Sequence, residues 1–294
     1  MCVLDVVFNF FLIFPTRELH IGARLVIMPG FGFGVWGAAL GTSLAEGVGA
    51  IVMLAKLIFF SKEMKLTSEK GSFKLRRGYM KRAFHIGFPM GIERFLTSGA
   101  QVMITIIVAP LGAASIAANA FAVIAESICY MPGSGIGDAT TTLVGQSIGA
   151  GRKKLTRQFA WTSTWLGMGV MTFLGGVMFA VAPWMMEIMT PDKEIIHLGV
   201  VALRTEAWAE PMYAASIVAY GAFVGAGDTL IPSFMNLGSM WGIRVVLAAL
   251  LAPVYGLHGV WIAMAIELTF RGAIFLVRLR SNAWMQRITK LQAM

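Results

Sequence analysis

The basic residues of this chain gather in three short stretches, and long apolar segments lie between them. Sixteen of the 24 Lys and Arg residues fall within residues 61–82, 149–158 and 278–294. Because cationic side chains collect in the cytoplasmic loops of polytopic membrane proteins, this pattern predicts membrane spans and their orientation. Charged residues make up only 13% of the chain, against roughly 25% in a soluble domain. The net charge of +9 therefore indicates loops beside anionic lipid headgroups rather than a nucleic-acid partner.

We predict an all-α polytopic membrane protein with about eight transmembrane helices. Successive loops of a multi-span protein lie on alternate sides of the membrane. With this assignment, one side carries sixteen Lys and Arg residues and the other carries Arg17, Arg24 and Lys193. The basic side is the cytoplasmic one, so the C-terminus is expected in the cytoplasm and the chain in a bacterial cytoplasmic (inner) membrane. The expected spans are residues 2–14, 34–60, 84–109, 115–147, 159–182, 196–223, 231–252 and 257–277.

Residues 61–82 are polar, charged and long enough to link two helical bundles. This predicts a partial N-terminal lobe of two spans in residues 1–60, a basic cytoplasmic linker, a six-helix lobe in residues 83–280, and a cytoplasmic tail in residues 281–294. The first span is shorter than the roughly 20 residues of a full crossing. We therefore expect part of it to lie upstream of Met1.

Two segments of the chain are similar to each other. GVWGAALGTSLAE (Gly34–Glu46) and GLHGVWIAMAIEL (Gly256–Leu268) both begin Gly-x-x-Gly and carry a Glu late in the apolar run. Similar segments with the same orientation suggest parallel repeats, although small residues recur in membrane helices for packing alone. If the repeat holds, a complete N-terminal lobe needs four further spans.

Four motifs occur in order along the six-helix lobe. GFPMGIE (Gly87–Glu93) opens its first span, and LVGQ-x-x-GAG closes a later span at Gly151. GAGDT-x-x-P then begins at Gly225, followed by N-x-x-x-x-W-x-x-R ending at Arg244. This set resembles the multidrug and toxic compound extrusion (MATE) family of efflux transporters.

The resemblance covers essentially the whole chain, which would correspond to the family's fifth to twelfth spans, the back two-thirds of a twelve-helix transporter. It implies two six-helix lobes around a central cavity. It also implies alternating access and export of amphipathic, often cationic compounds against inward flow of H⁺ or Na⁺.

Ionisable residues inside membrane spans are costly, so each is a functional candidate. Glu206 and Glu210 are four residues apart, which would place both carboxylates on one face of one helix. Two such groups repel, and such a pair can load and release a proton. The following Pro211 can free a backbone carbonyl for a cation. The alternative is that each Glu pairs with a structural Arg, such as Arg204 or Arg94.

Three further acids are candidates for cation coupling or substrate binding. Glu93 follows Pro89 within a span, and the resemblance implies an acidic coupling residue in this helix. Glu126 lies in the middle of its span and could face the cavity. Asp5 and Asn9 share one helix face, but several family members carry the Asn first and the cation-binding Asp four residues later. That reversed order weakens the direct transfer of an N-lobe cation site.

Other polar residues are expected to be structural. Arg244 is predicted to clamp helices together, Asp138 to make a helix–helix contact, and Asp228 to form a cytoplasmic turn or helix cap. Glu46 and Glu267 occupy matched positions of the repeat, so we predict a shared structural role.

The main hypothesis is a secondary drug antiporter acting on small amphipathic molecules, with no cofactor beyond the coupling H⁺ or Na⁺. A flippase for lipid-linked cargo would favour a basic cavity, whereas acids outnumber bases within these spans. An enzyme would need a nucleophile–base pair or a metal site, and the two Cys and four His residues show no metal-ligand spacing. A further alternative is a truncated fragment that is inactive without its missing N-terminal helices or a second chain.

Overall fold

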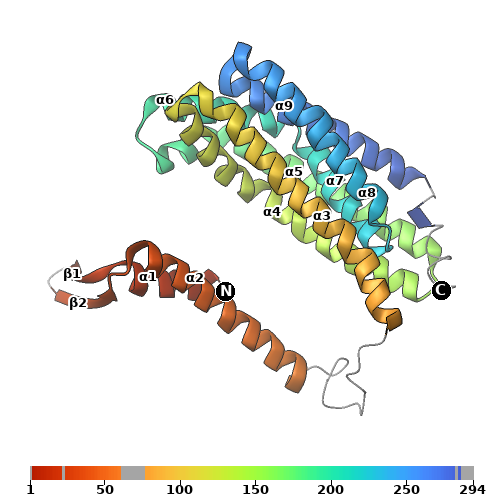
Figure 1. The fold of residues 1–294 in the computed structure, drawn as a ribbon, viewed down its shortest axis with the longest axis horizontal. Helices are drawn as coiled ribbons and strands as arrows, with labels where there is room; N and C mark the ends of the chain where they lie inside the picture. Colours follow the sequence, from red (N-terminus) through yellow and green to blue (C-terminus); the bar gives the residue numbers. More distant parts are fainter. Residues whose placement is uncertain (1, 22–23, 61–76, 282–283, 286–294) are drawn as a thin grey trace. The chain divides into compact units, whose positions relative to one another are not determined.

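The computed structural model describes residues 2–21, 24–60, 77–281 and 284–285 (Figure 1). The chain divides into two compact units, Met1–Leu75 and Arg76–Met294. The division falls inside the predicted linker, whose residues 61–76 lie outside the described residues, as do residues 286–294 of the predicted tail.

The first unit consists of two helices joined by a β-hairpin. Helix α1 (Cys2–Ile13) packs on α2 (Gly34–Ala55), which continues as the π-helical turn η1 (Lys56–Phe60). A Cβ atom at Gly37 would collide with the Leu12 backbone, so glycine is what allows this close approach.

The connection between these helices was predicted only as an external loop. In the structure it forms two antiparallel strands, β1 (Pro15–Ile21) and β2 (Arg24–Phe31), which pair from Pro15↔Phe31 to Ile21↔Arg24 with a register shift between Pro15 and Arg17. The strand pairing satisfies the backbone N–H and C=O groups of this segment.

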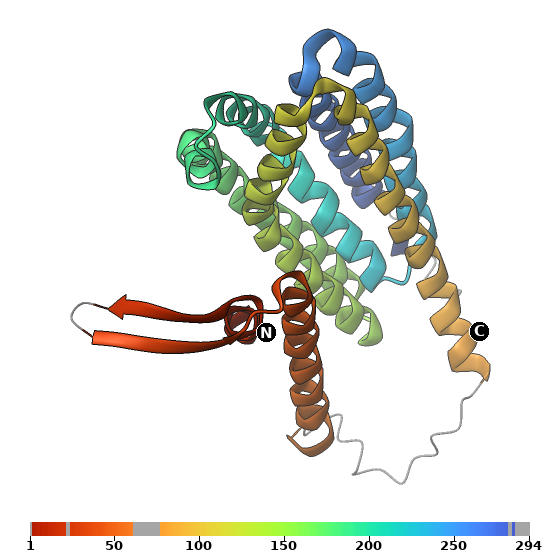
Figure 2. The same cartoon turned by 60° about the vertical axis from the view of Figure 1, so that its left-hand side comes forward.

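The second unit is a helical bundle, and the predicted all-α polytopic fold is confirmed (Figures 1 and 2). By length and composition, five helices of the described residues could cross a membrane. The elements of this unit are α3 (Arg77–Val108), η2 (Ala109–Leu111), α4 (Ala113–Gly149), α5 (Lys153–Met189), α6 (Lys193–Ala207), α7 (Glu210–Gly225), α8 (Leu230–Ser239), η3 (Met240–Val245) and α9 (Val246–Arg280).

Helix α7 lies inside this bundle, packed on α4, α5 and α9. Its contact with α4 is unusually close, because a Cβ at Gly221 or Gly225 would collide with the α4 backbone at Gly137 or Thr141. The Thr141 hydroxyl donates a hydrogen bond to the Gly221 carbonyl oxygen at 2.9 Å. Small residues and interhelical hydrogen bonds of this kind hold helices together where lipid removes the hydrophobic driving force.

The predicted span 196–223 is broken into α6 and α7 at Trp208–Ala209. Pro211 lies in the first turn of α7, where it has no N–H to donate to the carbonyl of Ala207. The break corrects the prediction that Glu206 and Glu210 share one helix, because Glu206 lies in the last turn of α6 and Glu210 begins α7.

The last two predicted spans form a nearly continuous helical run. It bends at Gly256, whose φ of 59° and ψ of −143° are not helical, three residues after Pro253. Glycine tolerates this positive φ, which strains other residues. The bend falls where a loop was predicted between residues 252 and 257.

Candidate functional site

Three carboxylates from three helices meet inside the second unit. Glu126 on α4 is 4% exposed, and Glu206 and Glu210 are 0% exposed. Glu206 lies within electrostatic range of both other carboxylates. The structure therefore keeps the predicted Glu206–Glu210 pair together across the helix break and adds Glu126 to it.

No described residue donates a hydrogen bond of standard geometry to either carboxylate oxygen of Glu206 or Glu210. The neighbour of Glu206 is the Glu126 carboxyl, and the Cys129 thiol lies beside Glu210. A buried carboxylate that accepts no hydrogen bond is strongly unfavourable. This arrangement can be stabilised by a proton or by another cation.

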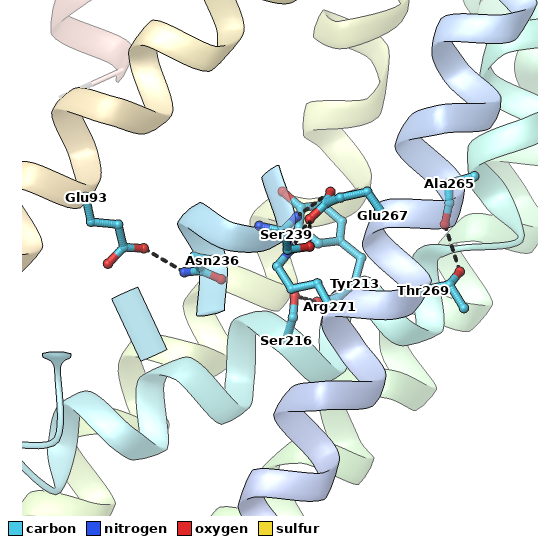
Figure 3. Close-up of polar contacts among 9 residues, drawn as sticks. All are labelled: Glu93, Tyr213, Ser216, Asn236, Ser239, Ala265, Glu267, Thr269 and Arg271. Atoms are coloured by element: carbon cyan, nitrogen blue, oxygen red, sulfur yellow. Dashed lines mark hydrogen bonds and ion pairs between the residues drawn. The ribbon is translucent and has the colours of Figure 1, made fainter. Parts of the chain in front are cut away.

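Two arginines face the acidic cluster, and one of them has its own partner. Arg271 pairs with Glu267 across 3.1 Å between Nε and Oε1, and Ser239 donates to the same carboxylate at 2.5 Å (Figure 3). The Arg271 guanidinium also lies over the Tyr213 ring, 5.5 Å from its centroid.

Arg244, 7% exposed in η3, is the other base within electrostatic range of Glu126 and Glu206. Four buried acids thus face one buried base, Arg244, and one half-buried base, Arg271, and the excess falls on the three clustered acids. The acids are Glu126, Glu206, Glu210 and Glu267.

Glu93 lies in a separate network of neutral donors. Its Oε2 accepts hydrogen bonds from the Tyr220 hydroxyl at 2.7 Å and the Ser233 hydroxyl at 2.5 Å. Its Oε1 accepts one from Asn236 Nδ2 at 2.6 Å (Figure 3). One carboxylate therefore joins α3 to α7 and α8, and among the described residues Glu93 forms no ion pair.

Replacing Glu93 with Ala is expected to destabilise the second unit by about 3 kcal/mol, because three inward-facing donors lose their acceptor. Tyr220→Phe removes one donor and should cost only about 1 kcal/mol. Both values can be measured as free energies of unfolding in detergent. Equal stability of the Glu93→Ala and Tyr220→Phe proteins would contradict the structural role of this network.

The pair Asp5 and Asn9 belongs to the first unit. Asn9 Nδ2 donates to Asp5 Oδ1 at 3.1 Å, which supports the prediction that both groups share one helix face. A Cβ at Gly41 would collide with the Asn9 side chain, so this residue also contacts α2.

Several predicted structural roles change. Asp138 is exposed and makes no side-chain hydrogen bond to a described residue, so the predicted helix–helix contact is not observed. Glu267 is fully buried in an ion pair whereas Glu46 is exposed, so their predicted shared role is wrong. Arg204 is exposed and donates to the Phe179 carbonyl oxygen at 3.3 Å, rather than pairing with Glu206 or Glu210.

Asp228 lies in the turn before α8, as predicted, but its main role is different. It is 1% exposed and forms an ion pair with Arg278 near the end of α9. The Arg278 guanidinium lies 5.5 Å from the centroid of the Phe223 ring. Sequence reasoning missed Arg278 here, and it missed Tyr220 and Ser233 beside Glu93, since none stands at a recognisable spacing from its partner.

The bundle, its apolar helices and its buried carboxylates define a multi-pass membrane protein with ionisable groups in its core. The family model MatE matches residues 89–250, more than half of the chain. The chain therefore belongs to the MatE family.

Curated relatives cover nearly all of this chain. It is 30% identical over 262 residues to a protein named "Probable multidrug resistance protein NorM" of Thermotoga maritima, covering 87% of this chain and 56% of that protein. It is 26% identical to the "Uncharacterized transporter YisQ" of Bacillus subtilis, covering 92% of this chain and 60% of that protein. The chain thus spans less than two thirds of the length of these relatives.

Solved structures share the fold. The Vibrio cholerae MATE transporter VcmN in its bent form matches with a TM-score of 0.79 at 17% identity, over 98% of this chain and 61% of that one. An outward-facing multidrug resistance MATE family transporter matches with a TM-score of 0.77 at 20% identity, over 90% and 58% of the two chains.

Proposed function

We propose that this chain takes part in secondary active efflux of amphipathic or cationic small molecules, driven by H⁺ or Na⁺ antiport with alternating access. The observation that carries the proposal is the buried carboxylate excess at Glu206 and Glu210, whose oxygens accept no hydrogen bond from the described residues. Ionisable groups at membrane depth characterise ion and substrate pathways. The family membership and the multidrug resistance named for its relatives support the same activity.

The proposal places the chain in a bacterial cytoplasmic membrane with its C-terminus in the cytoplasm, on the basis of the basic loops. It includes no enzymatic step and no cofactor. Its coupling ion binds at the carboxylates on α4, α6 and α7, and Asp5 with Asn9 is a second candidate site in the first unit. The complete transport unit includes further helices, either an N-terminal segment or a second chain.

The test is ethidium accumulation in bacteria that lack their own efflux pumps. The chain is expressed alone and together with the first four spans of a full-length relative. We expect at least one of these two forms to lower ethidium accumulation relative to cells that express neither. In that form we expect Glu210→Gln to restore accumulation. The matched control is Glu187→Gln, an exposed acid at the end of α5. Unchanged accumulation with both forms at normal membrane levels would overturn the proposal.

A further inference from the structure

Helix α3 shows three different faces along its membrane-spanning part, Gly87–Leu111. One face is buried and contains Glu93, Ala100, Ile104 and Val108. A second face is exposed and apolar, and it is formed by Phe88, Ile92, Phe95, Val102 and Ile106. Between them runs an exposed polar stripe, formed by Arg94, Ser98, Gln101 and Thr105.

The four polar residues are spaced by four, three and four positions, so they lie on one line along the helix. At 1.5 Å per residue the line is roughly 16 Å long, about half the thickness of the hydrocarbon core. Arg94 forms no ion pair with a described residue, and the Gln101 side chain has no hydrogen-bond partner among them. Lipid cannot cover such a surface without a large cost, because it offers no hydrogen bonds.

The middle of the stripe excludes the alternative that all of these polar side chains reach the lipid headgroups at the membrane surface. Arg94 is seven residues from the start of the span, near enough for its long side chain to reach toward lipid headgroups. Gln101 lies fourteen residues from one end and ten from the other. Its short side chain cannot reach either membrane surface, so its amide needs a polar partner at mid-depth.

We propose that this polar stripe lines a water-filled solute path, and that Arg94 in it attracts the anionic group of a zwitterionic or anionic amphipathic solute. The substrate class rests on the proposed efflux function, whereas the water-filled wall does not. Arg94 is the stripe's one charge, and it is positive. A guanidinium binds a carboxylate or phosphate with two parallel hydrogen bonds. The Ser98 and Gln101 groups offer neutral hydrogen bonds to the rest of the solute.

The test measures the reaction rates of introduced cysteines in native membranes, without any transport measurement. Cys2 and Cys129 are first replaced by Ser and Ala. Single cysteines are then placed at Ser98 or Gln101 in the polar stripe, and at Phe95 or Val102 in the adjacent apolar face as matched controls. Membrane-impermeant charged methanethiosulfonates are added from both sides. We expect the stripe cysteines to react about tenfold or more faster than the controls, because these reagents do not enter hydrocarbon.

A second measurement tests Arg94 itself. For a cysteine at Ser98, the quantity measured is the reaction rate with an anionic reagent divided by the rate with a cationic reagent. This ratio should fall by about threefold or more when Arg94 is replaced by Gln. It should be retained when Arg94 is replaced by Lys. Stripe cysteines as slow as the controls would overturn the water-filled wall. A ratio unaffected by Arg94→Gln would overturn the role of Arg94. Either result leaves the ethidium test of efflux unaffected, so the two proposals fail separately.

Discussion

Glu206→Gln is expected to abolish ion-coupled efflux while leaving the protein folded. Glutamine has the shape of glutamate, and it carries no charge into a buried position where no described residue donates a hydrogen bond to the Glu206 carboxylate. It can neither release a proton nor hold a cation by charge. In proteoliposomes containing a transport-competent form, ethidium movement driven by a pH or sodium gradient should fall by about tenfold or more.

The same preparation gives the necessary controls. Glu187→Gln changes an exposed acid on α5 and should transport normally. Thermal unfolding of Glu206→Gln should match or exceed that of the unmodified protein, because a buried charge is removed. Normal gradient-driven transport by Glu206→Gln would exclude this carboxylate from coupling. A response to only one of the two gradients would identify the coupling ion.

Asp228→Leu is expected to destabilise the second unit by about 3–5 kcal/mol, because it leaves Arg278 without its partner inside the protein. The ion pair connects the turn before α8 to the last turns of α9, 50 residues further along the chain. The free energy of unfolding in detergent measures the loss. Arg280→Leu, an exposed base two residues after Arg278, is the matched control and should cost less than about 1 kcal/mol.

The double replacement of Asp228 and Arg278 by Leu separates pairing from packing. Its cost should be well below the sum of the two single costs, since no buried charge remains unpaired. Additive costs would show that the two side chains stabilise the protein independently.

The helical architecture could be predicted because its causes are local. Apolar length determines which segments can cross a membrane, and the positions of Lys and Arg determine the expected orientation. The burial of Glu206 and Glu210 followed from their position inside an apolar segment, and the structure confirms that both are buried.

The partners of these residues could not be predicted, because they depend on which helix faces meet. Tyr220 and Ser233 are more than 120 residues away from Glu93 and contact it only after α3 packs beside α8. Glu46 and Glu267 are a different case, because the sequence itself carries a base, Arg271, four residues after Glu267 and only Ala50 four residues after Glu46. The prediction of a shared role compared the positions of the two acids and not their neighbours.

The break at Pro211 could have been predicted in part. Proline inside an apolar run was recognised as freeing a carbonyl, but the run was treated as one helix. The structure shows instead that α6 ends at Ala207 and that α7 begins at Glu210, with Pro211 in its first turn. The β-hairpin at Pro15–Phe31 was missed because its strands are short and lie between two stronger apolar signals.

The break between α6 and α7 places one carboxylate on each side of a backbone joint. The helical hydrogen-bond ladder is already interrupted at this joint, so a change of angle there breaks fewer helical hydrogen bonds than a bend within either helix. Under the proposed ion coupling, a cation held between Glu206 and Glu210 would favour the angle that brings the two carboxylates together. Thermodynamic reciprocity would then require that any force opening the joint weakens cation binding by the same free energy. Mechanical work at this joint and the chemical potential of the ion would thereby be interconvertible.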